Sequence, residues 1–140
     1  MSKWVIKVWG HEEVVVANPL YTLKRMLLLP ELQCSVHYHN RKTETFVVES
    51  GVLALETFEP LMVHGLVALT PTGDPTYDVD ARPNLHILSP TEQFTIPPLM
   101  AHRFYCAGHQ PCSFLEVSTE DLPEDSIRLT ESGPRPRSRP

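Results

Sequence analysis

The stretch "SVHYHNRKTETFVVESG", residues 35–51, combines two histidines two positions apart, a glutamate five positions later and a β-forming run that ends in glycine. Alternate residues of a β-strand point to the same face, so His37 and His39 point the same way. By the same rule Glu44 shares a face with Phe46 and Val48. Two bulky apolar neighbours indicate that Glu44 points into the protein.

A buried carboxylate such as Glu44 needs a compensating cation, because burying it alone costs several kcal/mol. Neutral imidazoles across what we expect to be a tight hairpin do not supply that charge. A divalent metal does, and neutral imidazole binds it well. A chance histidine pair on a polar strand end is the competing interpretation, and the rest of the chain decides between the two.

Short β-forming runs continue through most of the chain. No window has an apolar stripe of helical period with a cap at each end, and most of the fourteen prolines lie between the runs. This pattern predicts an all-β fold, a single β-barrel domain over residues 1–130. The expected strands are 21–29, 34–39, 43–50, 52–58, 61–70, 84–89, 92–97, 102–106 and 112–118.

Two segments fall outside this pattern. Residues 70–83 are polar and contain proline, which predicts a long surface loop. Residues 131–140, "ESGPRPRSRP", have no apolar content and are expected to be a disordered, solvated tail.

Composition limits the possible partners. The 140 residues carry a formal charge of -5, whereas nucleic acid or an anionic membrane would call for a basic face. No apolar run reaches the roughly 18 residues of a membrane span, and the N-terminus lacks the apolar core of a signal peptide. Three cysteines at unrelated spacings are expected to be reduced and buried, although Cys106 and Cys112 could face each other across a turn. We therefore expect a cytoplasmic protein.

A further histidine, His102, begins a strand after a Pro-Pro turn. H-x-H-x4-E-x6-G, ending at Gly51, and then P-x4-H from Pro97 to His102 resemble the two signature motifs of the cupins. The resemblance implies a double-stranded β-helix (jelly roll) in which His37, His39, Glu44 and His102 bind one metal. The second motif departs at two positions that are not ligands: the usual glycine is Leu99 and the usual asparagine is Cys106.

Segments outside the metal motifs are similar to the cupin domain of type II mannose-6-phosphate isomerases. This resemblance extends from Lys7 to Arg135, but the family's closing Tyr-Gly is replaced by Gly133-Pro134, and its glutamine at the first ligand position by His37. The long 70–83 insertion suggests a reshaped mouth. The matching positions are Lys7, Trp9, Gly10, Tyr21, Lys24, Ser35, Val47, Val48, Glu116, Val117, Glu124, Asp125, Ile127, Arg128 and Leu129.

The resemblance implies a metal-dependent aldose–ketose isomerase acting on a sugar or sugar phosphate. Mixed nitrogen and oxygen ligation would accept Zn²⁺, Mn²⁺, Fe²⁺, Co²⁺ or Ni²⁺. Catalytic candidates are Lys24 and Glu116, with Glu56 a weaker one. Lys24 shares a face with Met26 and Leu28, so it either points inward, where desolvation would lower its pKa, or protects an edge strand.

Lys7 and Arg128 are the candidates for binding an anionic substrate group, although Arg128 could instead pair with Glu124 or Asp125. Two alternatives to the isomerase stay open: another metal-dependent cupin enzyme of the dioxygenase type, and a non-catalytic sugar-binding cupin. Fold analogy favours a homodimer. The remaining histidines are expected to be surface or satisfied core residues: His11, His64, His86 and His109.

Overall fold

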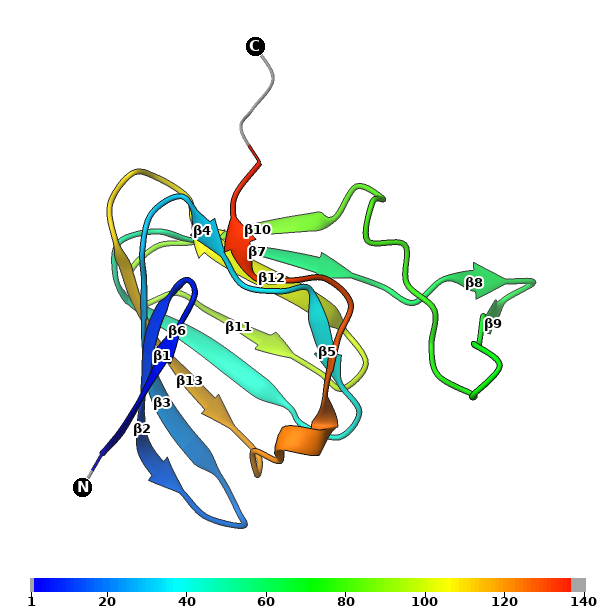
Figure 1. Cartoon of the computed structure of the whole chain (residues 1–140), viewed down its shortest axis with the longest axis horizontal. Coiled ribbons are helices and arrows are strands. Elements are labelled where there is room, and N and C mark those ends of the chain that lie inside the picture. The colour runs from blue at the N-terminus through cyan, green and yellow to red at the C-terminus, as the bar shows by residue number, and fades with distance from the viewer. Residues whose placement is uncertain (1, 137–140) are drawn as a thin grey trace.

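Two antiparallel sheets face each other in the computed structural model, which describes residues 2–136 (Figure 1). One sheet, called here the first sheet, has the order β1 (Lys3–Lys7), β2 (Gly10–Ala17), β3 (Thr22–Leu28), β13 (Cys112–Ser118), β6 (Glu44–Ser50) and β11 (Gln93–Ile96). The second sheet has the order β10 (Asn84–Leu88), β7 (Leu53–Phe58), β12 (Ala101–Cys106), β4 (Leu32–Gln33) and β15 (Gly133–Pro134), with β5 (His37–His39) between β12 and β14 (Ser126–Arg128).

Strands far apart in the chain are neighbours in both sheets, as in β3–β13–β6. This is the arrangement of a jelly roll, in which the chain passes repeatedly from one sheet to the other. The predicted all-β, double-stranded β-helix fold is confirmed.

The core lies between the two sheets and follows from strand alternation. In β6, Glu44, Phe46 and Val48 are buried while the residues between them are less so, as the sequence predicted. Phe46, Phe104 and Phe114 pack edge to face with ring centroids 5.1–5.9 Å apart. Each such ring contributes roughly 1.5–3 kcal/mol through burial. These rings lie directly behind the metal motif and hold its strands in place.

Gly51, the last residue of the first motif, turns the chain from β6 into β7. Its φ of +74° is in the left-handed region, and a Cβ atom there would lie 2.5 Å from the carbonyl oxygen of Pro111. Only glycine fits this conformation and this contact.

The 70–83 segment is a surface loop, as predicted, but it lies away from the barrel mouth. Tyr77 and Val79 pack on a small apolar cluster formed by Val36, Tyr38, Phe58 and Ala101 on the second sheet. No residue of 70–83 is among those that line the main cavity. The loop therefore covers the outside of the barrel and does not reshape its mouth.

Several strands differ from the prediction. β1, β2, β4, β14 and β15 were not predicted, and the expected strand 61–70 is a short hairpin of β8 (Met62–Val63) and β9 (Leu66–Val67). His64 and Gly65, with φ of 53° and 78°, form its turn. A left-handed pair of residues ends a strand, so the apolar run folds back on itself.

The predicted disordered tail is wrong for residues 131–136. Gly133 and Pro134 pair with Gln33 and Leu32, and the Arg135 guanidinium lies 3.7 Å from the centroid of the Tyr105 ring. The rest of the predicted tail, residues 137–140, lies outside the described residues.

The described chain contains a single short helix, the 3-10 turn η1 (Pro123–Asp125), and thus no helical segment long and apolar enough for a membrane crossing. Cys34, Cys106 and Cys112 are free and buried. Burial raises the pKa of the Cys34 and Cys112 thiols to about 12, so these two thiols are unreactive at neutral pH.

Candidate metal centre

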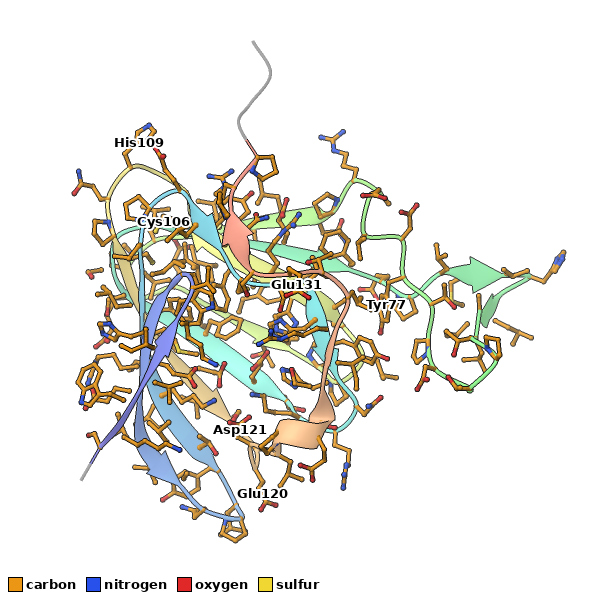
Figure 2. All side chains as sticks on the ribbon, viewed as in Figure 1. Tyr77, Cys106, His109, Glu120, Asp121 and Glu131 are labelled. Carbon is orange, nitrogen blue, oxygen red and sulfur yellow. The ribbon has the colours of Figure 1, made fainter. Side chains whose placement is uncertain are left out.

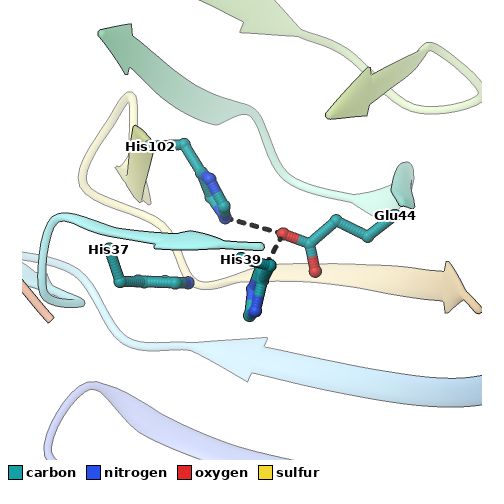
Figure 3. Close-up of side chains that lie close together, drawn as sticks. All are labelled: His37, His39, Glu44 and His102. Atoms are coloured by element: carbon teal, nitrogen blue, oxygen red, sulfur yellow. Dashed lines mark ion pairs between the residues drawn. The ribbon is translucent and has the colours of Figure 1, made fainter. Parts of the chain in front are cut away.

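Residues 40–43 carry the chain from the second sheet to the first. We expected β5 and β6 to form a tight hairpin, but β5 pairs with β12 and β14, and β6 pairs with β13 and β11. His37 lies directly opposite His102 on the neighbouring strand. Glu44 approaches His102 and His39 from the facing sheet (Figure 3). The crossing, and not a hairpin turn, therefore brings the motif residues together.

The four predicted ligands converge. His37, His39, Glu44 and His102 each offer one ligand atom, and these atoms all lie within 4.8 Å of one another. Glu44 Oε1 lies 2.6 Å from His102 Nε2 and 3.6 Å from His39 Nε2. Glu44, His39 and His102 are buried, and His37 is half-buried. Small side-chain adjustments would bring all four atoms to about 2 Å from one shared ion.

Backbone carbonyls fix the orientation of two of the rings. His37 Nδ1 lies 2.9 Å from the carbonyl oxygen of Ser35, and His102 Nδ1 lies 3.0 Å from that of Met100. A ring that donates its Nδ1 hydrogen to a carbonyl keeps the lone pair on Nε2. Both rings thus present a metal-binding nitrogen toward Glu44.

Four buried polar atoms of the cluster have no hydrogen-bond partner among residues 2–136: His39 Nε2, His102 Nε2 and both carboxylate oxygens of Glu44. The 2.6 Å contact between His102 and Glu44 is close enough for an ion pair but does not have hydrogen-bond geometry. Unsatisfied buried polar atoms cost about 1–3 kcal/mol each, so their concentration here calls for a partner. A divalent cation would satisfy all four, and the residues present fit it.

The protonation states suit a metal. Burial, with the charge of His102, lowers the pKa of His37 to about 3, and burial lowers that of His39 to about 4. Burial alone would raise the pKa of Glu44, but the positive charge of His102 and Lys42 holds it well below its usual range. For His102 the charge of Glu44 outweighs burial and raises the pKa. Two neutral imidazoles and a carboxylate are thus available at neutral pH, and a metal would displace the proton of His102.

A cavity of about 830 Å³ opens beside the cluster. His37 and His39 form part of its wall, together with residues of β1, β3 and the 121–132 segment. All four residues predicted for catalysis or substrate binding also line it: Lys7, Lys24, Glu116 and Arg128.

Lys24 and Glu116 point inward and are almost fully buried. Lys24 Nζ lies 2.7 Å from Asp121 Oδ2, 3.8 Å from Glu12 Oε1 and 3.9 Å from Glu116 Oε2. We expected burial to lower the pKa of Lys24. It does act in that direction, but the charges of Glu116, Glu12 and Asp121 outweigh it, and the net pKa is raised. Lys24 is therefore a permanent cation.

Glu116 has the opposite character. Burial and the nearby charge of Glu44 raise the pKa of Glu116 to about 7. A carboxyl group with a pKa near neutrality can both accept and return a proton.

Sequence reasoning missed Lys42, which connects the metal cluster to this network. Lys42 is buried, and its Nζ lies 3.3 Å from Glu44 Oε2, 3.5 Å from Glu116 Oε2 and 3.0 Å from Asp121 Oδ1. Strand periodicity gave no signal for Lys42, because it lies in the crossing between two strands. Glu12 and Asp121 were also missed. Glu12 lies on β2, a strand that was not predicted, and Asp121 lies on a loop.

The remaining candidates lie at the edge of the cavity or outside it. Arg128 is exposed at the mouth, and within residues 2–136 it forms no ion pair with Glu124 or Asp125. Glu56 is paired with Arg103 at 2.7 Å and does not line the cavity.

Comparisons with solved structures identify the fold. The chain is similar to the capsular polysaccharide assembling protein CapF from Staphylococcus aureus, with 17% identity, a TM-score of 0.70 and 93% of this chain covered. It is also similar to Bacillus subtilis oxalate decarboxylase, whose Mn(II) centres have been characterised, with 14% identity, a TM-score of 0.65 and 91% covered. The chain spans about a third of each of these longer proteins, 32% and 30% respectively. No protein-family profile and no curated protein sequence matches it.

These likenesses agree with the jelly-roll topology and with the four converged motif residues. The chain has a cupin fold. Peruvianin-I, described as a cysteine peptidase from Thevetia peruviana latex, is similar at a TM-score of 0.57 with 16% identity, and the match covers 80% of this chain and 57% of that protein. Proteins of such different activities share the fold, so the cupin assignment alone does not identify the chemistry.

The two departures from the second motif lie in different surroundings. Leu99, which stands where the motif usually has glycine, adopts a φ of 70°. Left-handed backbone costs a residue with a Cβ atom about 1–2 kcal/mol, so this turn is strained. Cys106, which replaces the usual asparagine, is fully buried in the core.

Proposed function

We propose that this cupin is a metal-dependent aldose–ketose isomerase of a sugar or sugar phosphate, related to the cupin domain of type II mannose-6-phosphate isomerases. One observation carries the proposal: a cluster of three histidines and a glutamate lies beside a cavity in which Lys24 and Glu116 form a buried acid–base network.

His37, His39, Glu44 and His102 would hold one divalent ion, chosen among Zn²⁺, Mn²⁺, Fe²⁺, Co²⁺ and Ni²⁺. When bound, the ion supplies Lewis-acid polarisation of substrate oxygens.

The chain's own residues would move the protons. Glu116 accepts the proton from the carbon next to the carbonyl group and returns it to the former carbonyl carbon. Lys24, held cationic by three carboxylates, donates a hydrogen bond to the oxygen on which negative charge develops. The hydroxyl proton passes to the other oxygen, so substrate and product are isomers and no oxidant or reductant is consumed.

Lys7 and Arg128 would bind an anionic group of the substrate at the mouth. The terminal segment lacks the closing Tyr-Gly of the isomerases; here Gly133-Pro134 pairs with β4 and Arg135 stacks on Tyr105. This observation favours a second candidate, a non-catalytic cupin that binds a sugar. A third, an enzyme of the dioxygenase type, would use the same ligands with iron.

Two of the similar solved structures bear on this proposal. CapF is described as a capsular polysaccharide assembling protein, so a similar fold occurs in a protein of polysaccharide assembly. Oxalate decarboxylase has Mn(II) centres, so a similar fold holds a transition metal there. We further propose a cytoplasmic homodimer with a small-molecule partner, and the three free cysteines agree with a reducing compartment.

The test begins with ion-loaded protein and a panel of aldoses, ketoses and their phosphates, followed by chromatography of the products. We expect interconversion in the wild type, its loss in His102→Ala and Glu44→Gln, and a loss of at least about 100-fold in Glu116→Gln with the ion retained. Glu56→Gln is the matched control, because Glu56 lies outside the cavity.

Each competing function has its own result. If the iron-loaded protein consumes oxygen, its function is that of a dioxygenase and not of an isomerase. If the ion-loaded protein binds a sugar tightly without converting it, the non-catalytic function is correct.

A further inference from the structure

The β8–β9 hairpin projects from the barrel (Figures 1 and 2). Among the described residues it carries a large group of exposed apolar side chains. We call residues 61–69 the apolar arm. Leu66 is 73% exposed, Leu69 61%, Met62 57% and Val63 55%. An isolated two-stranded hairpin is at best marginally stable in water. An arm of this composition therefore gains stability when another surface covers it.

An apolar groove lies at the base of the arm. It has a volume of about 430 Å³ and is formed by the arm and by the Pro-Pro turn that precedes β12. Its lining residues are Glu59, Pro60, Met62, Val67, Pro97, Pro98, Leu99 and Met100. The apolar arm and an apolar groove thus lie next to each other on one molecule.

Charge favours a second copy of this chain as the occupant. Residues 60–73 contain no Lys, Arg, Asp or Glu, although the whole chain carries a charge of -5. Two copies of an acidic protein repel each other, and a contact surface whose only charged residue is Glu59, at the groove, lets them meet where that repulsion is small. A different acidic protein would benefit equally from the lack of charge on the arm. It would, however, also need an arm and a groove that fit those of this chain.

The available area also suits a dimer. The exposed apolar side chains of the arm, with Leu99, present on the order of 600 Å² per copy, close to the roughly 800 Å² that each partner buries in a stable interface. A two-fold axis uses the arm–groove contact twice and leaves no arm uncovered.

We propose that the apolar arm is a dimerisation element, and that the tip of each arm, Val63 to Leu66, lies in the groove of a second copy. This proposal is independent of the isomerase function. It assigns the interface to the arm and not to the strand edges of the barrel.

The first experiment measures the mass of the full chain by sedimentation velocity between about 1 and 100 μM. We expect a wild-type dimer, and at least about a tenfold rise in its dissociation constant in Val63→Lys and in Leu66→Lys. Leu20→Lys is the matched control, because Leu20 is 80% exposed at the β2–β3 turn. Circular dichroism and ion content verify that the variants are folded, since the arm contributes nothing to the ion cluster.

The second experiment tests the arrangement of the two copies. Leu66→Cys and Leu99→Cys chains are produced together with different tags and treated with a short bismaleimide. Covalent pairs that carry both tags are expected, because the native cysteines are buried.

Three results would overturn the proposal. The first is a monomer over the whole concentration range, and the second is a dimer that Leu66→Lys leaves intact or that Leu20→Lys weakens equally. The third is a monomeric wild type that binds phosphatidylcholine vesicles through the arm, which would make the arm a membrane contact.

Discussion

The ammonium group of Lys42 lies within 3.5 Å of three carboxylates that come from separate parts of the chain: Glu44, Glu116 and Asp121. Lys42 occupies the side of Glu44 that carries Oε2, while Oε1 faces His39 and His102. One buried cation therefore neutralises charge in both the four-residue cluster and the buried network of Glu116 and Asp121.

Replacing Lys42 with Met should destabilise the metal-free protein by about 3–5 kcal/mol, because three buried or half-buried carboxylates lose a cation. Urea unfolding in the presence of a chelator measures the change, and Lys3→Met, at an exposed position, is the control. Adding a divalent ion should restore part of the loss through Glu44. A loss below about 1 kcal/mol would mean that the carboxylates do not depend on Lys42.

His39 gives a pH-dependent prediction. Its pKa is about 4 in the folded chain and about 6.5 when unfolded, so between these values the unfolded chain binds more protons. The contribution of neutral His39 is therefore complete above about pH 6.5 and is lost as the pH falls toward 4.

Comparison with His39→Gln isolates this contribution from those of His37, His102 and Glu116. Between pH 6.5 and pH 4, the metal-free wild type should lose up to about 3 kcal/mol of unfolding free energy relative to the variant. Urea titrations at several pH values measure it. Parallel pH profiles for the two proteins would show that His39 is not held neutral by burial.

The four candidate ligands could be predicted from the sequence, because strand alternation orients His37, His39 and Glu44 and the resemblance to the cupin motifs adds His102. Lys42 could not, since a lysine between two strands is ordinarily solvated. Its burial depends on the crossing of the chain between sheets, which brings Glu116 and Asp121 to it from positions more than seventy residues away. The raised pKa of Lys24 likewise depends on carboxylates that the fold brings to it, those of Glu116, Glu12 and Asp121.

At the scale of elements, Gly51 holds the β6–β7 turn against the loop before β13. Gly51→Ala should cost about 3 kcal/mol or more, because left-handed strain adds to a contact of 2.5 Å with a backbone oxygen. Gly73 has a similar φ of +85°, but an added Cβ atom would meet no other atom within 4 Å, so Gly73→Ala should cost only about 1 kcal/mol. Thermal and urea unfolding measure both. Equal costs would mean that the turn relaxes around the new methyl group.

Strands with clear buried alternation, such as β3 and β6, were predicted, whereas several short or exposed strands were missed. β1 has exposed apolar residues and β14 and β15 are very short, so their sequences resemble loops. The segment 61–70 was predicted wrongly for the opposite reason: it is mostly apolar, yet the turn at His64 and Gly65 leaves most of its apolar side chains in solvent. The period of apolar residues in a sequence indicates which side chains are buried. The missed strands are held by backbone pairing, which leaves no such pattern.

At the scale of the whole molecule, the jelly roll brings two sequence-distant motifs onto facing sheets around one buried cluster. The cavity beside it is lined by both signs of charge, and the apolar arm lies on another part of the barrel. Ion binding and self-association should therefore be separable by mutation.

Metal analysis of the purified chain by mass spectrometry, after supply of each candidate ion and removal of the excess, tests whether the four residues form a metal centre. We predict about one tightly held divalent transition ion per chain in the wild type. In His102→Ala and Glu44→Gln the ion should be lost while the circular dichroism spectrum is kept. A folded wild type that retains none of the ions, or a His102→Ala variant that retains as much as the wild type, would contradict the assignment.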